Sequence, residues 1–183
     1  MPRADWINGF ENISPRELPN QLIRYPKASN TSKENKLDLP DEMRGSGPLV
    51  SIILPTYNDS EYITEALETV GRQSYNNIEL VIVDQSNVHW IENISKNRKW
   101  IKYIQKEPAG ASVARNEGLV ASTGEIISFL DADDYWHPEK ISNEVEILRE
   151  DNGINIVMSD FFKVKLYGDD GLSSYHEVDV SLG

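Results

Sequence analysis

Three carboxylates stand together in the segment Asp131-Ala132-Asp133-Asp134, directly after an apolar run. In an extended segment, side chains alternate, so Asp131 and Asp133 share one side. Two such carboxylates repel each other unless a cation joins them, and oxygen ligands at this spacing suit Mg²⁺ or Mn²⁺. We therefore expect a metal site at Asp133 and Asp131, completed by a substrate diphosphate. The structural alternative is a turn, with Asp134 capping the next helix.

A single cation, Arg115, lies in a stretch of small residues between Gly110 and Gly118. Small residues allow the start of a helix to approach a ligand closely, and a guanidinium can hold phosphate oxygens through two hydrogen bonds. The structural alternative is a surface arginine on a helix that packs closely through glycine.

Tyr57 and the pair Asp84-Gln85 could recognise a nucleoside. An aromatic ring can stack on a base, and carboxylate and amide groups can hydrogen-bond the edges of base and ribose. The structural alternatives are an aromatic side chain at a strand end and a turn.

Strands and helices are expected to alternate from Pro48 onward. Apolar runs at 49–54, 79–83 and 126–130, and a shorter one at 101–105, predict strands, with Pro55 ending the first. Helices are expected after Asp59 or Ser60, with Ile63, Leu67 and Val70 on the buried face, over 88–98, over 111–121, and from Pro138. This order predicts an α/β, Rossmann-like fold: an open, mostly parallel sheet with helices on both faces. Ligands of such sheets bind beyond the carboxyl ends of the strands, where the polar clusters fall.

Composition excludes several classes of function. The net charge of −12 would repel a phosphate backbone, so we expect no nucleic-acid binding. The chain has no cysteine, and any metal must therefore bind oxygen or imidazole. No run approaches the ~18 apolar residues that a transmembrane helix needs, and the first ten residues do not resemble a secretory signal. We expect a cytoplasmic protein.

Four sequence blocks identify a resemblance: VSIILPTYN at 50–58, ELVIVD at 79–84, ARNEG at 114–118 and TGEIISFLDADD at 123–134. In this order they resemble the successive blocks of glycosyltransferase family 2, over roughly residues 48–162. The resemblance implies the GT-A fold, a nucleotide-diphospho-sugar donor, Mn²⁺ or Mg²⁺, and transfer with inversion. It also implies polysaccharide or related biosynthesis, with a glycan, lipid-linked or protein acceptor, in the cytoplasm or at the cytoplasmic face of the membrane.

By position, the resemblance also assigns residues. Asp133 would be the main metal ligand, with Asp131 near the metal or the ribose, and Arg115 would stabilise the departing nucleoside diphosphate. The donor-binding residues would be Pro55, Thr56, Tyr57, Asn58, Asp84, Gln85, Arg115, Asp131 and Ala132. Gln85 departs from the family, which usually has a second Asp there, so the donor base is not assigned.

The resemblance also divides the chain. We expect an N-terminal extension, partly linker, at 1–47, the nucleotide-sugar-binding domain at 48–167, and a tail at 168–183 that begins a missing acceptor region. The general base is expected beyond Gly183, with Asp160 as the candidate inside the chain. Uncovered apolar surface is expected to favour self-association at Ile156, Met158, Phe161 and Phe162.

Two other functions remain open at this stage. One is a truncated module that binds a sugar nucleotide but transfers nothing. The other is a nucleotidyltransferase that makes sugar nucleotides, which the lack of a glycine-rich phosphate loop after the first strand disfavours.

Overall fold

The computed structural model describes the chain from Leu37 to Asp179, with gaps. The described residues are 37, 39–58, 63–86, 90–151, 153–159, 163–167 and 175–179. The chain divides into two compact units, of which the larger spans residues 30–157. The other unit contains an antiparallel pair of strands, β5 (Lys163–Tyr167) and β6 (Tyr175–Asp179). The expected site residues that are described all lie in the larger unit.

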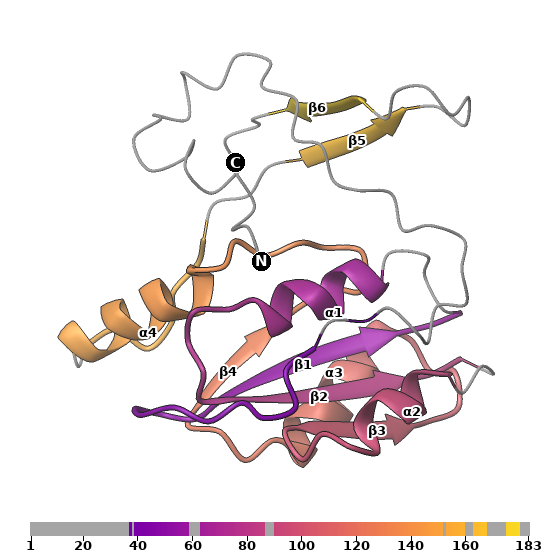
Figure 1. Cartoon of the computed structure of the whole chain (residues 1–183), viewed down its shortest axis with the longest axis horizontal. Coiled ribbons are helices and arrows are strands. Elements are labelled where there is room, and N and C mark those ends of the chain that lie inside the picture. Colours follow the sequence, from indigo (N-terminus) through magenta and orange to yellow (C-terminus); the bar gives the residue numbers. More distant parts are fainter. Residues whose placement is uncertain are drawn as a thin grey trace. The chain divides into compact units, whose positions relative to one another are not determined.

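The larger unit is built on a four-stranded sheet in the order β3-β2-β1-β4, with every pair of neighbours parallel (Figure 1). Its strands are β1 (Val50–Thr56), β2 (Ile78–Asp84), β3 (Ile101–Gln105) and β4 (Ile126–Phe129). Its helices are α1 (Ile63–Gly71), α2 (Trp90–Ser95), α3 (Ala111–Ala121) and α4 (Lys140–Glu150). Each connection between successive strands passes through a helix, which confirms the predicted Rossmann-like α/β fold.

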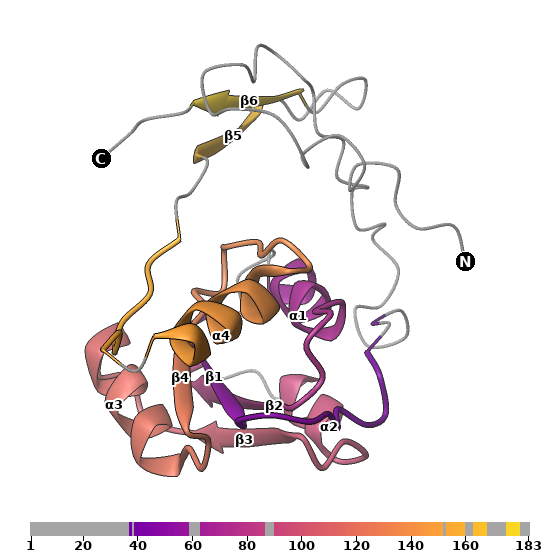
Figure 2. The same cartoon turned by 90° about the vertical axis from the view of Figure 1, so that its left-hand side faces the viewer.

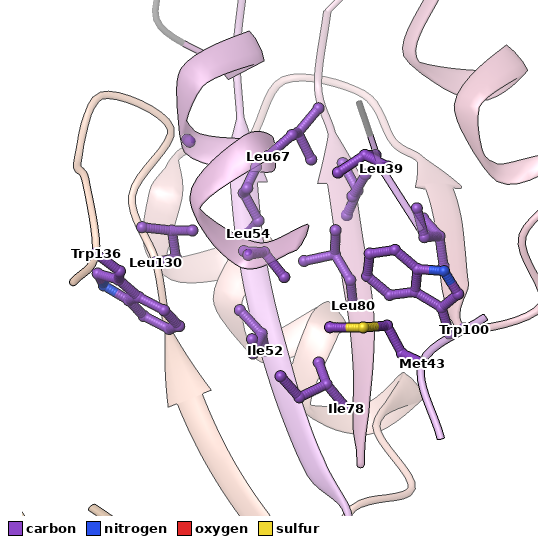
Figure 3. Close-up of a cluster of buried hydrophobic side chains, with 14 of the residues drawn as sticks. Leu39, Met43, Ile52, Leu54, Leu67, Ile78, Leu80, Trp100, Leu130 and Trp136 are labelled. Atoms are coloured by element: carbon purple, nitrogen blue, oxygen red, sulfur yellow. The ribbon is translucent and has the colours of Figure 1, made fainter. Parts of the chain in front are cut away.

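Helices cover both faces of the sheet (Figure 2). On one face, Leu54 and Leu80 pack in a large apolar cluster that includes residues of α1, α2 and α4 (Figure 3). On the other face, Val81 and Val83 pack against Ala114 of α3. β1 and β2 are buried along their whole length because they are the two central strands, which explains why their sequences are almost continuously apolar.

Contrary to the prediction, Pro55 does not end the first strand, which runs on to Thr56. The backbone of Ile53 faces β4, since its carbonyl accepts a hydrogen bond from the Leu130 N–H. Two residues further on, Pro55 faces the same side, but the pairing of β1 with β4 has already ended at Ile53. The missing N–H of proline therefore leaves no ladder hydrogen bond unmade.

Part of the expected N-terminal extension packs onto this domain. Leu39 and Met43 are buried in the large apolar cluster, close to Trp100 (Figure 3). The indole N–H of Trp100 donates to the Pro40 carbonyl at 3.0 Å, and Arg98 donates to the Leu39 carbonyl at 3.3 Å. The core therefore begins before the expected boundary at residue 48.

The strand at 101–105 and the helix at 111–121 have the expected bounds. The helix expected over 88–98 ends at Ser95, and residues 88 and 89 lie outside the described residues. Ile63, Leu67 and Val70 form the buried face of α1, as predicted. The expected caps, Asp59 and Ser60, lie outside the described residues. Within the described part of the chain, no helix has the length and apolar character needed to span a bilayer.

Candidate functional site

A cleft of about 610 Å³ opens at the carboxyl ends of β1, β2 and β4, beside the start of α3. It is lined by Pro55, Thr56, Tyr57, Gln85, Pro108, Gly110, Ala111, Ala114, Arg115, Asp131, Ala132 and Asp133. The predicted donor-binding residues are thus in its wall, with the exception of Asn58 and Asp84. The three polar clusters that the sequence placed at strand ends do meet at one edge of the sheet.

The end of β1 supplies an aromatic ring and a buried hydroxyl. Tyr57 is 57% exposed and lines the cleft, so its ring is accessible to a ligand. Asn58 adopts a φ of 54°, in the left-handed region that Asn tolerates better than most residues, and the chain turns there. Thr56 is 4% exposed, and its Oγ1 is buried with no hydrogen-bond partner among the described residues. Such orphaned groups are rare in proteins, and this one belongs to a residue of the cleft wall.

The end of β2 places Gln85 in the cleft and Asp84 behind it. Asp84 is fully buried. One of its oxygens accepts from the Ser86 N–H at 2.8 Å, and the other accepts from the Tyr103 hydroxyl at 2.9 Å. Burial and this bond to Asp84 raise the pKa of Tyr103, which therefore stays a donor. The backbone N–H of Gln85 donates to the Thr56 carbonyl at 2.9 Å, joining the ends of β1 and β2.

The start of α3 gives the cleft a positive wall. Gly110 precedes the helix with a φ of 91°, a conformation that glycine adopts without strain, and no side chain caps the helix. The first N–H groups of a helix attract anions. Arg115, one turn further along, forms an ion pair with Asp131 across the cleft. The cationic side chain of Arg115 thus lies next to the acidic segment.

The acidic segment forms a turn in which the Asp134 N–H donates to the Asp131 carbonyl at 3.0 Å. Partial burial and the charges of Asp133 and Asp131 raise the pKa of Asp134, the direction expected for crowded carboxylates. Asp133 is exposed and lines the cleft. An added cation would relieve this repulsion.

Sequence reasoning missed Gln73, which holds the segment that follows the acidic turn. Gln73 is buried just after α1, where its side-chain amide donates to the His137 carbonyl at 2.9 Å. Its amide oxygen accepts from the Ile141 N–H at 3.1 Å, in the first turn of α4. A buried amide serving both groups fixes where the chain goes after the acidic turn. The sequence carries no local signal of this role, because the partners are more than sixty residues away.

The described residues can supply some of the ligands of a metal ion but not all of them. No group of three or more His, Cys, Asp or Glu side chains among them is arranged to hold an ion. Asp133 and Asp131 offer oxygen ligands, although one oxygen of Asp131 is engaged by Arg115. Mg²⁺ commonly binds through one or two carboxylates and takes its other ligands from water and substrate phosphates. The donor set therefore agrees with the predicted use of a diphosphate to complete the shell.

Comparison with known proteins decides the family. Residues 51–174 match the family model described as Glycosyl transferase family 2. The chain belongs to this family. This finding confirms the resemblance seen in the four sequence blocks, and it argues against the nucleotidyltransferase alternative.

The relatives of this family 2 chain are longer proteins. An uncharacterised glycosyltransferase of Rickettsia felis is 32% identical over 133 residues, which are 69% of this chain and 22% of that protein. The putative teichuronic acid biosynthesis glycosyltransferase TuaG of Bacillus subtilis is 35% identical over 109 residues, which are 56% and 43% of the two chains. The chain thus spans less than half the length of these relatives.

A solved structure supports the same fold. Residues 1–349 of S. aureus TarS in complex with UDP-GlcNAc match with a TM-score of 0.51 and 28% identity, over 63% of this chain and 39% of that one. The same protein in complex with UDP matches equally well, with a TM-score of 0.51 and 29% identity. The larger unit of the chain therefore has the GT-A, Rossmann-like fold of these transferases.

Proposed function

We propose that the cleft binds a nucleotide-diphospho-sugar and that the chain is the donor-binding part of an inverting, metal-dependent glycosyltransferase. One observation carries the proposal: an exposed aromatic ring, a cationic helix start and two carboxylates line the same cleft. These groups match, in order, a base, a diphosphate and a divalent cation. The UDP and UDP-GlcNAc complexes of the similar TarS protein support this choice of ligand class.

The base would lie between Tyr57 and Gln85, and the diphosphate at the start of α3 with Arg115. Asp133, with Asp131, would hold Mn²⁺ or Mg²⁺, which neutralises negative charge on the departing diphosphate when it is bound. All of these residues would bind or stabilise the nucleoside diphosphate, which is the leaving group of the transfer. The acceptor is proposed to be a glycan, lipid-linked or protein hydroxyl. Asp160, the candidate general base, lies outside the described residues.

The ion pair between Arg115 and Asp131 does not obstruct this function. Their side chains are 34% and 47% exposed, and solvent-exposed pairs of this kind are worth at most about 1 kcal/mol. A diphosphate with two or more negative charges competes effectively for the guanidinium. We expect Arg115 to exchange its carboxylate partner for phosphate oxygens, which leaves Asp131 free to face the cation or the ribose.

Calorimetric titration of the chain with UDP, GDP and CDP, with and without Mn²⁺, tests the proposal. We expect metal-dependent binding of at least one nucleotide. Asp133→Asn, which removes a charge and little volume, should weaken it about tenfold or more, because a lost ligand oxygen in a charge-assisted site is worth at least about 1.4 kcal/mol. Asp41→Asn removes one exposed charge elsewhere and should change nothing. Equal binding by the Asp133→Asn variant and the wild type would contradict the metal assignment.

A further inference from the structure

A buried charge lies directly behind the base end of the cleft. The carboxylate of Asp84 is fully buried, and both of its oxygens are used. The Ser86 N–H donates to one oxygen from within the same turn. The Tyr103 hydroxyl, on the neighbouring strand β3, donates to the other. A carboxylate without such donors is costly to bury, so these two bonds hold the turn in one conformation.

Gln85 lies between Asp84 and Ser86, the two residues joined by the hydrogen bond within the turn. Its backbone N–H donates to the Thr56 carbonyl at 2.9 Å, and its side-chain amide reaches the Gly110 carbonyl at 3.5 Å. The next residue, Ser86, is also held through its carbonyl, which accepts from Gln105 at 3.4 Å. Gln85 is almost fully buried yet lines the cleft. Its side-chain amide lies beside Gly110, another residue of the cleft wall, in a position that the turn determines.

We propose that Tyr103 is a positioning residue for recognition of the donor base, acting through Asp84 on the turn that carries Gln85. This inference rests on the proposed function. Without the Tyr103 hydroxyl, one buried oxygen of Asp84 has no donor, and the turn must rearrange to provide one. That rearrangement moves the amide of Gln85 away from the base edge. Arg115 and Asp133, which lie on α3 and after β4, keep their places.

A matched pair of variants separates this role from general stability. Tyr103→Phe removes the hydroxyl that serves Asp84. Tyr75→Phe also removes one hydroxyl from a half-buried tyrosine, but that hydroxyl donates to the Pro48 carbonyl at 2.6 Å, before the start of β1 and so at the other end of the strand from the cleft. Thermal unfolding should show that both variants fold, with the larger loss of stability in Tyr103→Phe, because its hydroxyl serves a buried carboxylate and that of Tyr75 serves a backbone carbonyl.

Binding is then measured with two kinds of probe in Mn²⁺: UDP, GDP and CDP, which carry a base, and inorganic pyrophosphate, which does not. We expect Tyr103→Phe to weaken binding of the preferred nucleotide about tenfold, or about 1.4 kcal/mol, and to reduce discrimination among the three bases. Its affinity for pyrophosphate should not change. Tyr75→Phe should alter neither measurement. An unchanged nucleotide affinity in Tyr103→Phe, or an equal loss for pyrophosphate, overturns the inference while leaving the proposed function intact.

A double-mutant cycle tests whether the effect passes through Gln85. In the Gln85→Ala background, Tyr103→Phe should cause no further loss of nucleotide affinity, because the side chain it positions is gone. Additive losses overturn the proposal, since they mean that Tyr103 acts by another route. A wild-type chain that binds none of the three nucleotides overturns the proposed function, and the inference with it.

Discussion

Glu79 is predicted to make the fold sensitive to acid. It lies near the start of β2, and its side chain is only 9% exposed. Its carboxylate accepts hydrogen bonds from Ser51 on β1 and from both the N–H and the hydroxyl of Thr123, which precedes β4. Lys102 on β3 completes the cluster with an ion pair at 2.7 Å. One charge thus joins the amino ends of the strands.

The magnitude follows from the pKa of Glu79. Burial alone would raise this pKa, but the bonds from Lys102, Ser51 and Thr123 together outweigh burial and lower it from 4.5 to about 2. A difference of this size corresponds to about 3 kcal/mol of stability when the group is ionised. Because the pKa is lowered on folding, the contribution is complete above pH ~5 and is lost as the pH falls from 4.5 towards 2. About 2 kcal/mol should be gone by pH 3.

Urea unfolding of the wild type and of Glu79→Gln, at several values of pH between 7 and 3, measures this contribution. The free energy of unfolding of the wild type should exceed that of the variant at pH 7, and the gap should shrink by about 2 kcal/mol at pH 3. Glu107→Gln, at an exposed position, should change the free energy of unfolding by less than about 0.5 kcal/mol at pH 7. A gap between wild type and Glu79→Gln that stays constant from pH 7 to pH 3 would refute the reasoning.

Two further predictions concern packing and the cleft. Gly118→Ala should destabilise the fold by about 1–3 kcal/mol in urea unfolding, because a Cβ there would lie 2.4 Å from Cγ2 of Ile53. Val120→Ala, at an exposed position of the same helix, should change stability by less than about 0.5 kcal/mol. Thr56→Val replaces an unpartnered buried hydroxyl by a methyl group, so the ligand-free chain should be unchanged or up to about 1 kcal/mol more stable. Calorimetry with the preferred nucleotide should show weaker binding to Thr56→Val, and an unchanged affinity would mean that the hydroxyl does not meet the ligand.

The sheet could be predicted because the apolar runs of its strands can be buried in few ways. Almost continuous apolar runs such as that of β2 can be buried only between two layers of helices. The bounds of α3 were also readable from the sequence, although the residue that caps its end is Ser122, in an extended conformation. Leu39 and Met43 were missed because they pack from irregular backbone, which has no period. The run of β1 through Pro55 was missed because it depends on where β4 stops pairing.

The location of the candidate site was predictable, but which residues of each polar cluster line the cleft was not. Parallel strands bring their carboxyl ends to one edge, so polar clusters after strands must converge there. Successive residues at a strand end, however, point to opposite sides. Asp84 and Gln85 both looked like ligands for a nucleoside, yet only Gln85 lines the cleft and Asp84 is buried behind it. Which residue of such a pair faces the cleft depends on the register of the strands and on a partner in β3. Neither can be recognised from the sequence around the pair.

Polar groups at the amino and carboxyl ends of the sheet differ in how well they are paired with other groups, and this difference bears on function. At the amino end, the charge of Glu79 is fully matched by donors from three directions. At the carboxyl end, the hydroxyl of Thr56 has no partner among the described residues, α3 starts without a side-chain cap, and Asp133 stands beside Asp134. Each of these features lowers the stability of the ligand-free chain, and stability alone would favour replacing them. A nucleoside diphosphate with a divalent cation would meet both the uncapped start of α3 and the neighbouring carboxylates, so the proposed ligand accounts for more than one feature of this edge.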